Sequence, residues 1–412
     1  MRSDLEDLMQ EASLDALLVR GPAAHNPAMA YFTGLRHVTR GYLIKVRGKD
    51  PILFHDPMER EEAAATGLRT RSLADLDERK LLEQAQGDLN LAEAMLLKRI
   101  FEELGLRGRV AIYGKVEVGP AWTSFRNLEQ MLPEVEIVGE GRLDSVIARA
   151  RLTKDVQEIE RIRTVGKAVT AVVADVASFL TSHQVRNGHL VNREGEPLTV
   201  REVKRKINLW LAMRGADNPK GCIFAVGREA GIPHSAGTDD NPIPVGQTII
   251  FDIYPCEAGG GYYFDFTRTW CLGHAPDEVQ AAYEDVIAVY EKLFTALRPG
   301  GFCRDYQIQA CELFESRGHP TQLNSPKTTD GYVHSLAHGI GLEVHEAPSF
   351  SLQAANKDRL QEGSVITLEP GLYYPERGFG VRIEDTVWIR PDGQPEVLAE
   401  FPKDLVLRMP AA

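Results

Sequence analysis

The sequence of 412 residues predicts two domains, an α/β domain over residues 1–148 and an α+β domain over residues 149–412. Three observations support this division. A single hydrophobic core rarely grows beyond about 250–300 residues, so a chain of this length is expected to form more than one. Short apolar runs alternate with helical patterns in the first part. In the second part, two pairs of helical patterns are each followed by strand-like runs, and acidic residues and histidines gather there.

The composition is that of an ordinary soluble protein, with 43% hydrophobic and 26% charged residues. A formal net charge of −12 argues against nucleic acid or an anionic membrane as a partner. No apolar run approaches the roughly 18 residues of a membrane span, and the acidic N-terminus is unlike a signal peptide. The five scattered cysteines favour free thiols in a reducing cytoplasm. Cys256 is either a soft metal ligand or a small buried hydrophobe.

The first domain is predicted as short strands with helices between them. Strands are expected at Leu14–Val19, Tyr31–Leu35, Gly41–Val46, Pro51–His55, Arg109–Gly114 and Val135–Glu140. Helices are expected at Asp4–Ala12, at Leu89–Leu104 and around Trp122–Met131. Ionisable groups do not cluster in this part of the sequence. We therefore expect a lid or oligomerisation domain without chemistry of its own, in a protein that forms a homodimer.

The second domain is predicted to begin with a long amphipathic helix after a crossing segment at Asp144–Arg151. Asp155 and Glu158 fit the capping box that starts such a helix. The other elements expected are helices at Thr199–Arg214, Pro276–Leu297 and Asp305–Arg317 and strands at Cys222–Gly227 and Ile249–Tyr254. Because the order of helices and strands recurs, the domain has a rough internal duplication at the level of its elements.

A predicted hairpin carries two aspartates, Asp252 and Asp265, on either side of the turn Gly259–Gly261. Strand alternation places Asp265, Thr267 and Thr269 on one face, so the two aspartates could face each other across the strand pair. Two apposed buried carboxylates repel each other unless a cation lies between them. The alternative is that both aspartates sit at solvated strand ends.

Three histidines and two glutamates follow in the last quarter of the chain. His334, His338 and His345 lie within twelve residues in HSLAHGIGLEVHE, beside glycines that allow a close backbone approach to a ligand. Glu369 ends the apolar run SVITLE, and Glu384 lies inside GVRIEDTVWI. A glutamate in an apolar strand is costly unless it is paired or binds a metal.

Arg382 leaves a second explanation open for Glu384. The two residues share a strand face, so a buried Arg–Glu ion pair is an alternative to metal ligation. Four carboxylates with one histidine form a hard, oxygen-rich set that suits two divalent metal ions, with Mn2+ as our expectation and Co2+ or Zn2+ as alternatives. Ions in such sites share a bridging water or hydroxide and polarise the substrate carbonyl. The remaining histidines could bind the oxyanion or carry protons. The sequence therefore predicts a metal-dependent hydrolase.

Four motifs, DxxPxxxxGxxxxDxTRT, HSLxHGxGLxxHE, TLEPGLY and GVRIEDT, resemble the signature segments of the pita-bread metallopeptidases. This family includes methionine aminopeptidase, Xaa-Pro aminopeptidase, prolidase and the metal-free creatinase. The resemblance covers Leu152 to Val387 in family order, and residues 1–145, with AMAYFTGL, resemble the creatinase-like N-terminal domain. It implies a pita-bread catalytic domain that follows a smaller creatinase-like α/β domain.

The resemblance also implies the metal ligands. Asp252 would chelate one ion, Asp265 and Glu384 would bridge both, and His338 and Glu369 would hold the other. Glu369 would also be the base for the bridging water.

Four further residues match positions around the substrate. His345 would contact the peptide carbonyl and the tetrahedral intermediate, and His234 and His334 would lie near the bound peptide, His334 with a catalytic role. Arg382 would orient the bridging glutamate.

For function, the resemblance implies an Xaa-Pro aminopeptidase, which acts on peptides with proline at the second position. The alternatives are an Xaa-Pro dipeptidase, another C–N hydrolase or lyase on this fold, and a non-catalytic binding protein. Ser349 stands where prolidases carry an arginine for the dipeptide carboxylate, and the hairpin tip is longer than in the family pattern. An unpaired carboxylate is costly, so we expect tripeptides to be cleaved better than dipeptides. Arg359 or an N-terminal arginine could supply the missing charge instead.

Overall fold

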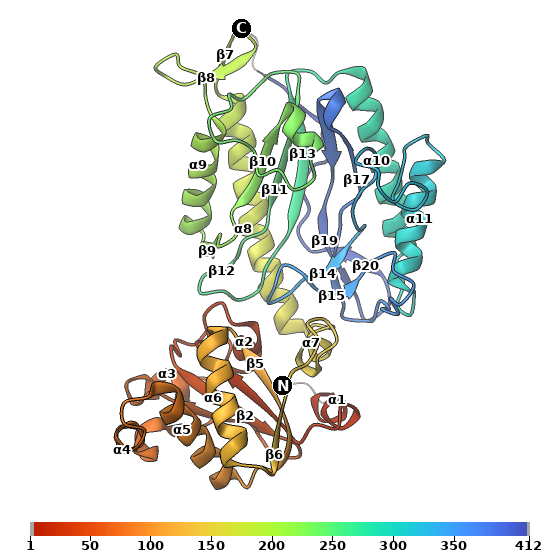
Figure 1. Ribbon diagram of the computed structural model, residues 1–412. Coiled ribbons are helices and arrows are strands. Elements are labelled where there is room, and N and C mark those ends of the chain that lie inside the picture. Colours follow the sequence, from red (N-terminus) through yellow and green to blue (C-terminus); the bar gives the residue numbers. More distant parts are fainter. Residues whose placement is uncertain (1–3, 410–412) are drawn as a thin grey trace. The chain divides into compact units, whose positions relative to one another are not determined.

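The computed structural model describes residues 4–409, which form two compact units (Figure 1). The first unit runs to Arg151 and includes Gly259–Gly261, and the second unit comprises the rest of the chain from Leu152 onward. The domain boundary expected after residue 148 falls inside helix α7 (Val146–Ala150), which belongs to the first unit. Each unit has hydrophobic clusters of its own.

The first unit is built on one six-stranded sheet with the order β4-β3-β2-β1-β5-β6. Strand β1 pairs antiparallel with β2 and parallel with β5, so the sheet is mixed. Its strands are β1 (Ala16–Arg20), β2 (Gly41–Val46), β3 (Ile52–His55), β4 (Arg69–Ser72), β5 (Gly108–Gly114) and β6 (Val135–Val138). Its other helices are α1 (Leu5–Glu11), α2 (Pro27–Thr33), α3 (Arg60–Ala64), α4 (Glu78–Gln84), α5 (Leu89–Leu104) and α6 (Val118–Met131).

One element of the first unit was predicted wrongly. The segment Tyr31–Leu35, expected as a strand, lies at the end of helix α2 and in the turn after it. Pro27 occupies the first turn of this helix, where its fixed φ angle is favourable. Six of the seven residues of α2 are buried, so their pattern has no polar face. A short, wholly apolar run has no periodicity that separates a helix from a buried strand.

The second unit begins with helix α8 (Val156–Thr181), and Asp155 and Glu158 form the predicted capping box at its start. Helices α8 and α9 (Val200–Met213) lie on one side of the strands in Figure 1, and α10 (Asp277–Ala296) and α11 (Cys303–Glu315) lie on the other. The two helix pairs confirm the recurring element order. By length and composition α8 alone, among the described residues, could cross a membrane. It buries nine residues in the protein, and one such helix is weak evidence for a span.

The strands between these helices form two main sheets. A four-stranded sheet has the order β10-β11-β13-β21, and a five-stranded sheet has the order β15-β14-β16-β19-β20. The strands of this unit are β7 (Gln184–Arg186), β8 (His189–Val191), β9 (Ala216–Asp217), β10 (Cys222–Val226), β11 (Thr248–Ile253), β12 (Cys256–Glu257), β13 (Phe266–Leu272), β14 (His338–Gly339), β15 (Glu346–Ser349), β16 (Val365–Leu368), β17 (Gly371–Tyr374), β18 (Phe379–Arg382), β19 (Asp385–Ile389), β20 (Pro395–Val397) and β21 (Val406–Leu407).

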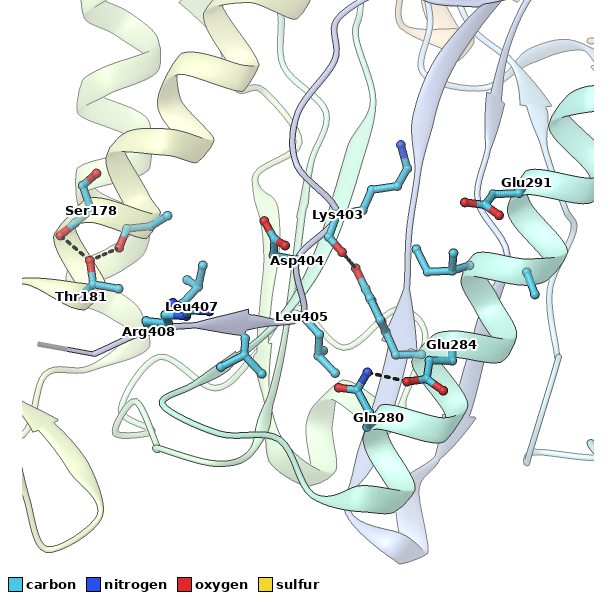
Figure 2. A pocket seen from close by; sticks show the side chains of 15 residues that line it. Ser178, Thr181, Gln280, Glu284, Glu291, Lys403, Asp404, Leu405, Leu407 and Arg408 are labelled. Atoms are coloured by element: carbon cyan, nitrogen blue, oxygen red, sulfur yellow. Dashed lines mark hydrogen bonds between the residues drawn. The ribbon is translucent and has the colours of Figure 1, made fainter.

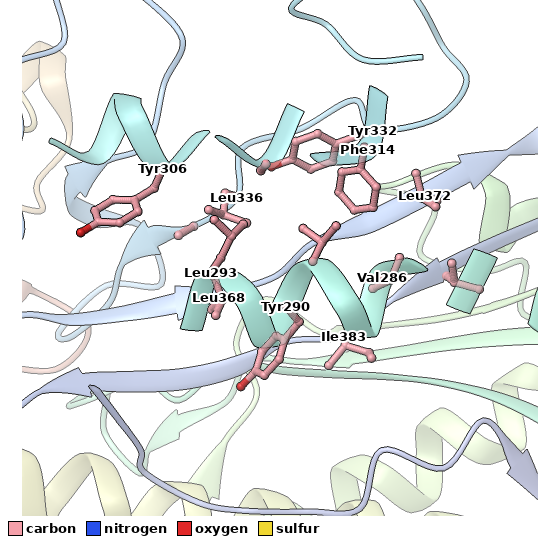
Figure 3. Packing of buried hydrophobic residues seen from close by; sticks show 14 of the residues in the cluster. Val286, Tyr290, Leu293, Tyr306, Phe314, Tyr332, Leu336, Leu368, Leu372 and Ile383 are labelled. Atoms are coloured by element: carbon pink, nitrogen blue, oxygen red, sulfur yellow. The ribbon is translucent and has the colours of Figure 1, made fainter. Parts of the chain in front are cut away.

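The two sheets meet at Thr267 of β13. Its backbone pairs with Asp252 of β11 on one side and forms an isolated bridge with Glu384 on the other. Behind this junction, α10 and α11 pack on the strands through a large apolar cluster (Figure 3). Tyr290 and Leu293 of α10 contribute to it, together with Phe314 of α11. This packing fixes the strands that carry the candidate site.

Candidate metal centre

The two aspartates of the hairpin lie on neighbouring strands, but they are not directly opposite each other. Asp252 of β11 pairs with Thr267 of β13, and Asp265 comes just before β13, two positions earlier. The prediction that the two aspartates face each other directly is therefore wrong. They lie on the same face of the strand pair, but Asp265 is diagonal to Asp252, two residues away from its paired residue. Asp252 and Asp265 are 8% and 4% exposed, which excludes the alternative of solvated strand ends.

Asp265, His338 and Glu384 form one group that could hold a metal ion. One ligand atom from each residue lies within 4.8 Å of the other two. His338 Nε2 is 3.7 Å from Asp265 Oδ2 and 3.5 Å from Glu369 Oε1, so Glu369 borders the same group. The structure thus brings together residues from β14 and from the positions just before β13, just after β16 and just before β19.

The carboxyl groups of this cluster are electrostatically unfavourable without a cation. Burial, and then the charges of Asp252 and Glu369, raise the pKa of Asp265 well above its usual value. Burial, and then the charges of Asp265 and Glu369, raise the pKa of Glu384 in the same way. Burial raises the pKa of Glu369 to about 8, although Arg382 opposes the shift. Such a set of acids favours bound protons over negative charge, and dications can take the place of those protons.

Arg382 pairs directly with Asp252, and its Nε donates at 3.3 Å to the Thr267 hydroxyl that in turn binds Glu384, so its role of orienting the bridging glutamate stays a prediction. Its Nη2 lies 2.7 Å from Asp252 Oδ2. Glu384 instead accepts a hydrogen bond of 2.6 Å from the Thr267 hydroxyl. Alternation correctly placed Arg382 and Glu384 on one face, but it could not predict which carboxylate on the facing strand the long side chain would reach.

The same guanidinium organises His334 through Tyr373. Arg382 Nη1 donates to the Tyr373 hydroxyl at 2.6 Å, and that oxygen lies 2.9 Å from His334 Nε2. His334 Nδ1 lies 2.8 Å from the Ser335 carbonyl, which can only accept, so the proton is on Nδ1 and Tyr373 donates to Nε2. Burial, and then the Arg382 charge, lower the pKa of His334 to about 3. His334 is therefore neutral in the site.

The other two substrate-side histidines, His234 and His345, are exposed. The ring of His345 lies edge-on to that of His338, with 4.4 Å between their centroids. His234 lies in the turn after β10, and the carbonyl of the preceding Pro233 is 3.4 Å from Arg382 Nη1. His345 therefore lies beside the predicted ligand His338, and His234 follows a residue in contact with Arg382. Their roles stay predictions.

The donor set fits divalent cations. Asp252 Oδ1 is buried and has no hydrogen-bond partner in the structure, although its other oxygen is paired with Arg382. A buried carboxylate oxygen needs a partner, and a cation supplies one. Asp265 and Glu384 hold their oxygens close together with raised pKa values, which is the arrangement expected of ligands that share ions.

Comparisons with known proteins agree with this chemistry. The profile of metallopeptidase family M24 matches residues 160–391, more than half of the chain. The chain belongs to this family. The profile of the creatinase/prolidase N-terminal domain matches residues 1–153. The protein is therefore an M24 metallopeptidase, a hydrolase with a creatinase-like N-terminal domain and a pita-bread catalytic domain. Membership of this metallopeptidase family implies that the protein uses divalent metal ions.

Relatives of this M24 metallopeptidase match it over nearly their whole length. The Xaa-Pro dipeptidase of Pyrococcus furiosus is 28% identical, and the alignment covers 95% of this chain and 97% of the relative. The Xaa-Pro dipeptidase of Lactobacillus delbrueckii is 26% identical, with 94% of each chain covered.

Solved structures have the same fold over the full chain. The prolidase from Pyrococcus furiosus has a TM-score of 0.70 and 25% identity, covering 96% of this chain and 99% of that one. The X-Pro aminopeptidase from Thermotoga maritima has a TM-score of 0.74 and 23% identity, covering 97% and 99%.

Sequence reasoning missed two residues of the M24 site. Thr267 supports Glu384 by its hydroxyl, and Tyr373 links Arg382 to His334. A signal existed for both, because Thr267 shares a strand face with Asp265, and Tyr373 lies in the motif segment TLEPGLYY after Glu369. Cys256, considered as a soft ligand, is fully buried, and burial is what a small hydrophobe needs.

A cavity of about 1080 Å³ lies elsewhere in the catalytic unit of this peptidase (Figure 2). It is lined by residues of α8 and α10 and by the C-terminal segment Lys403–Arg408. None of the predicted site residues lines it. The site is therefore identified by the chemistry of its side chains and not by the volume of this cavity.

Proposed function

We propose that this M24 metallopeptidase is an Xaa-Pro dipeptidase, which hydrolyses the bond before proline in a dipeptide. The observation that carries the proposal is the match to Xaa-Pro dipeptidases from Pyrococcus and Lactobacillus over 93–97% of their lengths. These relatives favour the dipeptidase over the aminopeptidase, which the sequence analysis placed first. The carboxylate cluster around Asp265 and Glu384 supplies the metal-binding chemistry that such an enzyme needs.

In this proposal two divalent ions, with Mn2+ as the proposed native metal, are held by the five predicted ligands. Those ligands are Asp252, Asp265, His338, Glu369 and Glu384. Bound dications would supply Lewis acidity, which makes water nucleophilic near neutral pH and polarises a carbonyl. Metal analysis of purified protein, after its exchange into metal-free buffer and reloading, tests the number and the identity of the ions.

Side chains of the protein carry out the remaining steps of the proposed reaction. Glu369 accepts the proton of the attacking water, since its carboxyl lies at the edge of the cluster and is 16% exposed. His345 donates a hydrogen bond to the carbonyl oxygen as negative charge develops there. Arg382 holds Asp252 in place, and through Tyr373 it fixes the ring orientation of His334.

One observation favours the second candidate, an Xaa-Pro aminopeptidase acting on longer peptides. Ser349 occupies the position where the family pattern has an arginine in prolidases, and its own N–H is bound to Asp358 at 2.7 Å. Arg359, the substitute considered in the sequence analysis, lies 3.4 Å from the centroid of the Phe302 ring and donates to the Gly300 carbonyl. The substrate carboxylate would then have to be bound by another cation.

Kinetics with matched substrates test the proposal. We expect Xaa-Pro dipeptides to be cleaved with kcat/KM at least about tenfold above Xaa-Pro-Xaa tripeptides, a difference of about 1.4 kcal/mol in transition-state binding. Xaa-Ala dipeptides are the control for the need for proline. The variant Ser349→Arg restores the family's charge at this position and is expected to raise dipeptide turnover further. A preference for tripeptides that Ser349→Arg reverses would instead establish the aminopeptidase.

A further inference from the structure

A buried ion pair outside the metal centre joins the start of the catalytic unit to the loop that carries His345. Lys154 Nζ lies 3.1 Å from Glu346 Oε2, and the two side chains are only 2% and 6% exposed. Burying two charges is costly, and their attraction offsets the cost only with good geometry and further hydrogen bonds. Breaking such a pair on one side leaves a charge without compensation, so the structure strongly favours this one arrangement of the two segments.

On the loop side, Glu346 closes the turn that contains His345. Its Oε1 accepts a hydrogen bond of 2.9 Å from the backbone N–H of Glu343. A Cβ atom on Gly341 would lie 2.7 Å from Glu346 Oε2 and 2.8 Å from Lys154 Cε, so the pair packs against bare backbone there. The Gly341 carbonyl in turn accepts from the Tyr263 N–H at 2.7 Å. The segment from Gly341 to Glu346 is therefore tied at both ends.

On the other side, Lys154 is held by the strand that leads to Glu369. Its backbone N–H donates to the Gly363 carbonyl at 2.8 Å, and the neighbouring Thr153 forms a β-bridge with Ser364. Gly363 and Ser364 directly precede β16, and β16 ends at the residue before Glu369. Lys154 therefore connects the segment before β16, the strand that leads to the predicted ligand Glu369, with the loop that carries His345.

We propose that the Lys154–Glu346 ion pair is a positioning device for His345. His345 is exposed and adjacent to Glu346 in the chain, and its ring lies edge-on to His338. The direction of the His345 side chain is set by the anchored turn before it and by strand β15 after it. The inference rests on the proposed function, in which His345 contacts the substrate carbonyl. A misplacement of about 1 Å at such a contact can cost up to about 100-fold in rate.

The test uses Glu346→Gln and Lys154→Met, with Glu346→Asp as a conservative variant that keeps the charge. The matched control is Asp175→Asn, which breaks the Arg214–Asp175 pair (2.6 Å) between α8 and the C-terminal end of α9 in the same unit. We expect Glu346→Gln to lower kcat by about 10- to 100-fold, with KM within about twofold and metal content unchanged. Glu346→Asp should recover part of the loss, and the control should keep its activity.

Two further measurements separate positioning from a general structural effect. In a His345→Ala background, Glu346→Gln should cause no further loss, because both changes act through one contact. The imidazole NMR signal of His345, assigned with His345→Asn, should shift or broaden in Glu346→Gln and Glu346→Asp but not in Asp175→Asn.

Three outcomes would overturn the proposal: an unchanged kcat in Glu346→Gln, an equal fold-loss with and without His345, or an unmoved NMR signal. If Glu346→Gln does not fold, the same criteria apply to Lys154→Met, which removes the other partner of the ion pair. The NMR result does not depend on the substrate, so it separates failure of this inference from failure of the dipeptidase proposal. An enzyme that leaves Xaa-Pro dipeptides uncleaved would refute the latter alone.

Discussion

Glu384 and Asp385 are neighbours in the chain and equally buried, yet their carboxyl groups behave in opposite ways. Glu384 is 2% exposed and faces Asp265 and Glu369, and burial and these charges raise its pKa well above the usual value. Asp385 is 0% exposed and faces Arg268 and Lys403. Burial would raise its pKa too, but the two cations hold the pKa below its usual range.

The difference shows that the balance of surrounding charges, and not burial, distinguishes the candidate metal centre around Glu384 from the structural ion pairs around Asp385. On the Asp385 side, one carboxylate receives Arg268 at 2.8 Å, Lys403 at 2.7 Å and the Tyr290 hydroxyl at 2.6 Å. On the Glu384 side, the carboxylates share one arginine, Arg382, among the contacts of the described residues. Around Asp385, cationic side chains of the protein itself balance the carboxylate charge. Around Glu384, the charges are balanced only when cations are bound.

The largest effect is expected from removing a carboxylate on the site side. Glu384→Ala or Asp265→Ala should lower kcat/KM by at least about 10³-fold and reduce the bound metal, since each is a predicted ligand of both ions. Enzyme kinetics and elemental analysis measure the two effects. A variant that keeps near-normal turnover and two metals per chain would remove that residue from the ligand set.

Removing the carboxylate on the other side should instead affect stability. Asp385→Asn leaves the fully buried Arg268 without its anion and removes the partner of the partly exposed Lys403, so we expect the free energy of unfolding to fall by about 3–5 kcal/mol. Glu384→Gln in metal-free protein replaces a carboxyl whose raised pKa favours its neutral form by a neutral amide, so stability should stay equal or rise. Urea unfolding of both variants in the presence of a chelator makes the comparison. Equal losses would contradict the distinction between the two faces.

His345→Ala sharpens the comparison within the site side. We expect turnover to fall by about 10²- to 10³-fold, the usual cost of losing one donor to a developing oxyanion. Metal content should stay unchanged, because His345 lies beside the predicted ligand His338 and is not itself in the predicted ligand set. Parallel measurement of kcat and bound metal decides the point, and loss of metal would make His345 a ligand.

The smallest expected effect is a pH dependence of metal affinity. The pKa of Glu369 is raised to about 8, so without metal this carboxyl holds a proton near neutral pH that bound cations must displace. Affinity should therefore rise by about tenfold per pH unit as this proton is lost, and the Glu369 contribution should level off above about 8. His338, with a pKa lowered by burial to about 3, adds nothing in this range. Calorimetry between pH 6 and 9 would reveal a flat profile if the carboxyls were already ionised.

The sequence by itself determined the elements and residue types that local patterns encode. Helix α5 spans Leu89–Leu104 as predicted, because its periodicity and the glycine that follows are local signals. The capping box at Asp155 is equally local. Strand alternation alone places Glu384 and Asp385 on opposite faces. The four motifs were sufficient to predict the family and the candidate ligands.

Only the tertiary structure decided which of these residues meet. The register of β11 on β13 set Asp252 opposite Thr267, and Arg382 reached Asp252, 130 positions away, instead of its neighbour Glu384. Lys154 and Glu346 are 192 positions apart, and nothing near either residue in the chain predicts their contact. Local patterns fix the face on which a side chain lies. The partner of a long charged side chain depends on strand register and on how the buried charges balance, and both are properties of the assembled core.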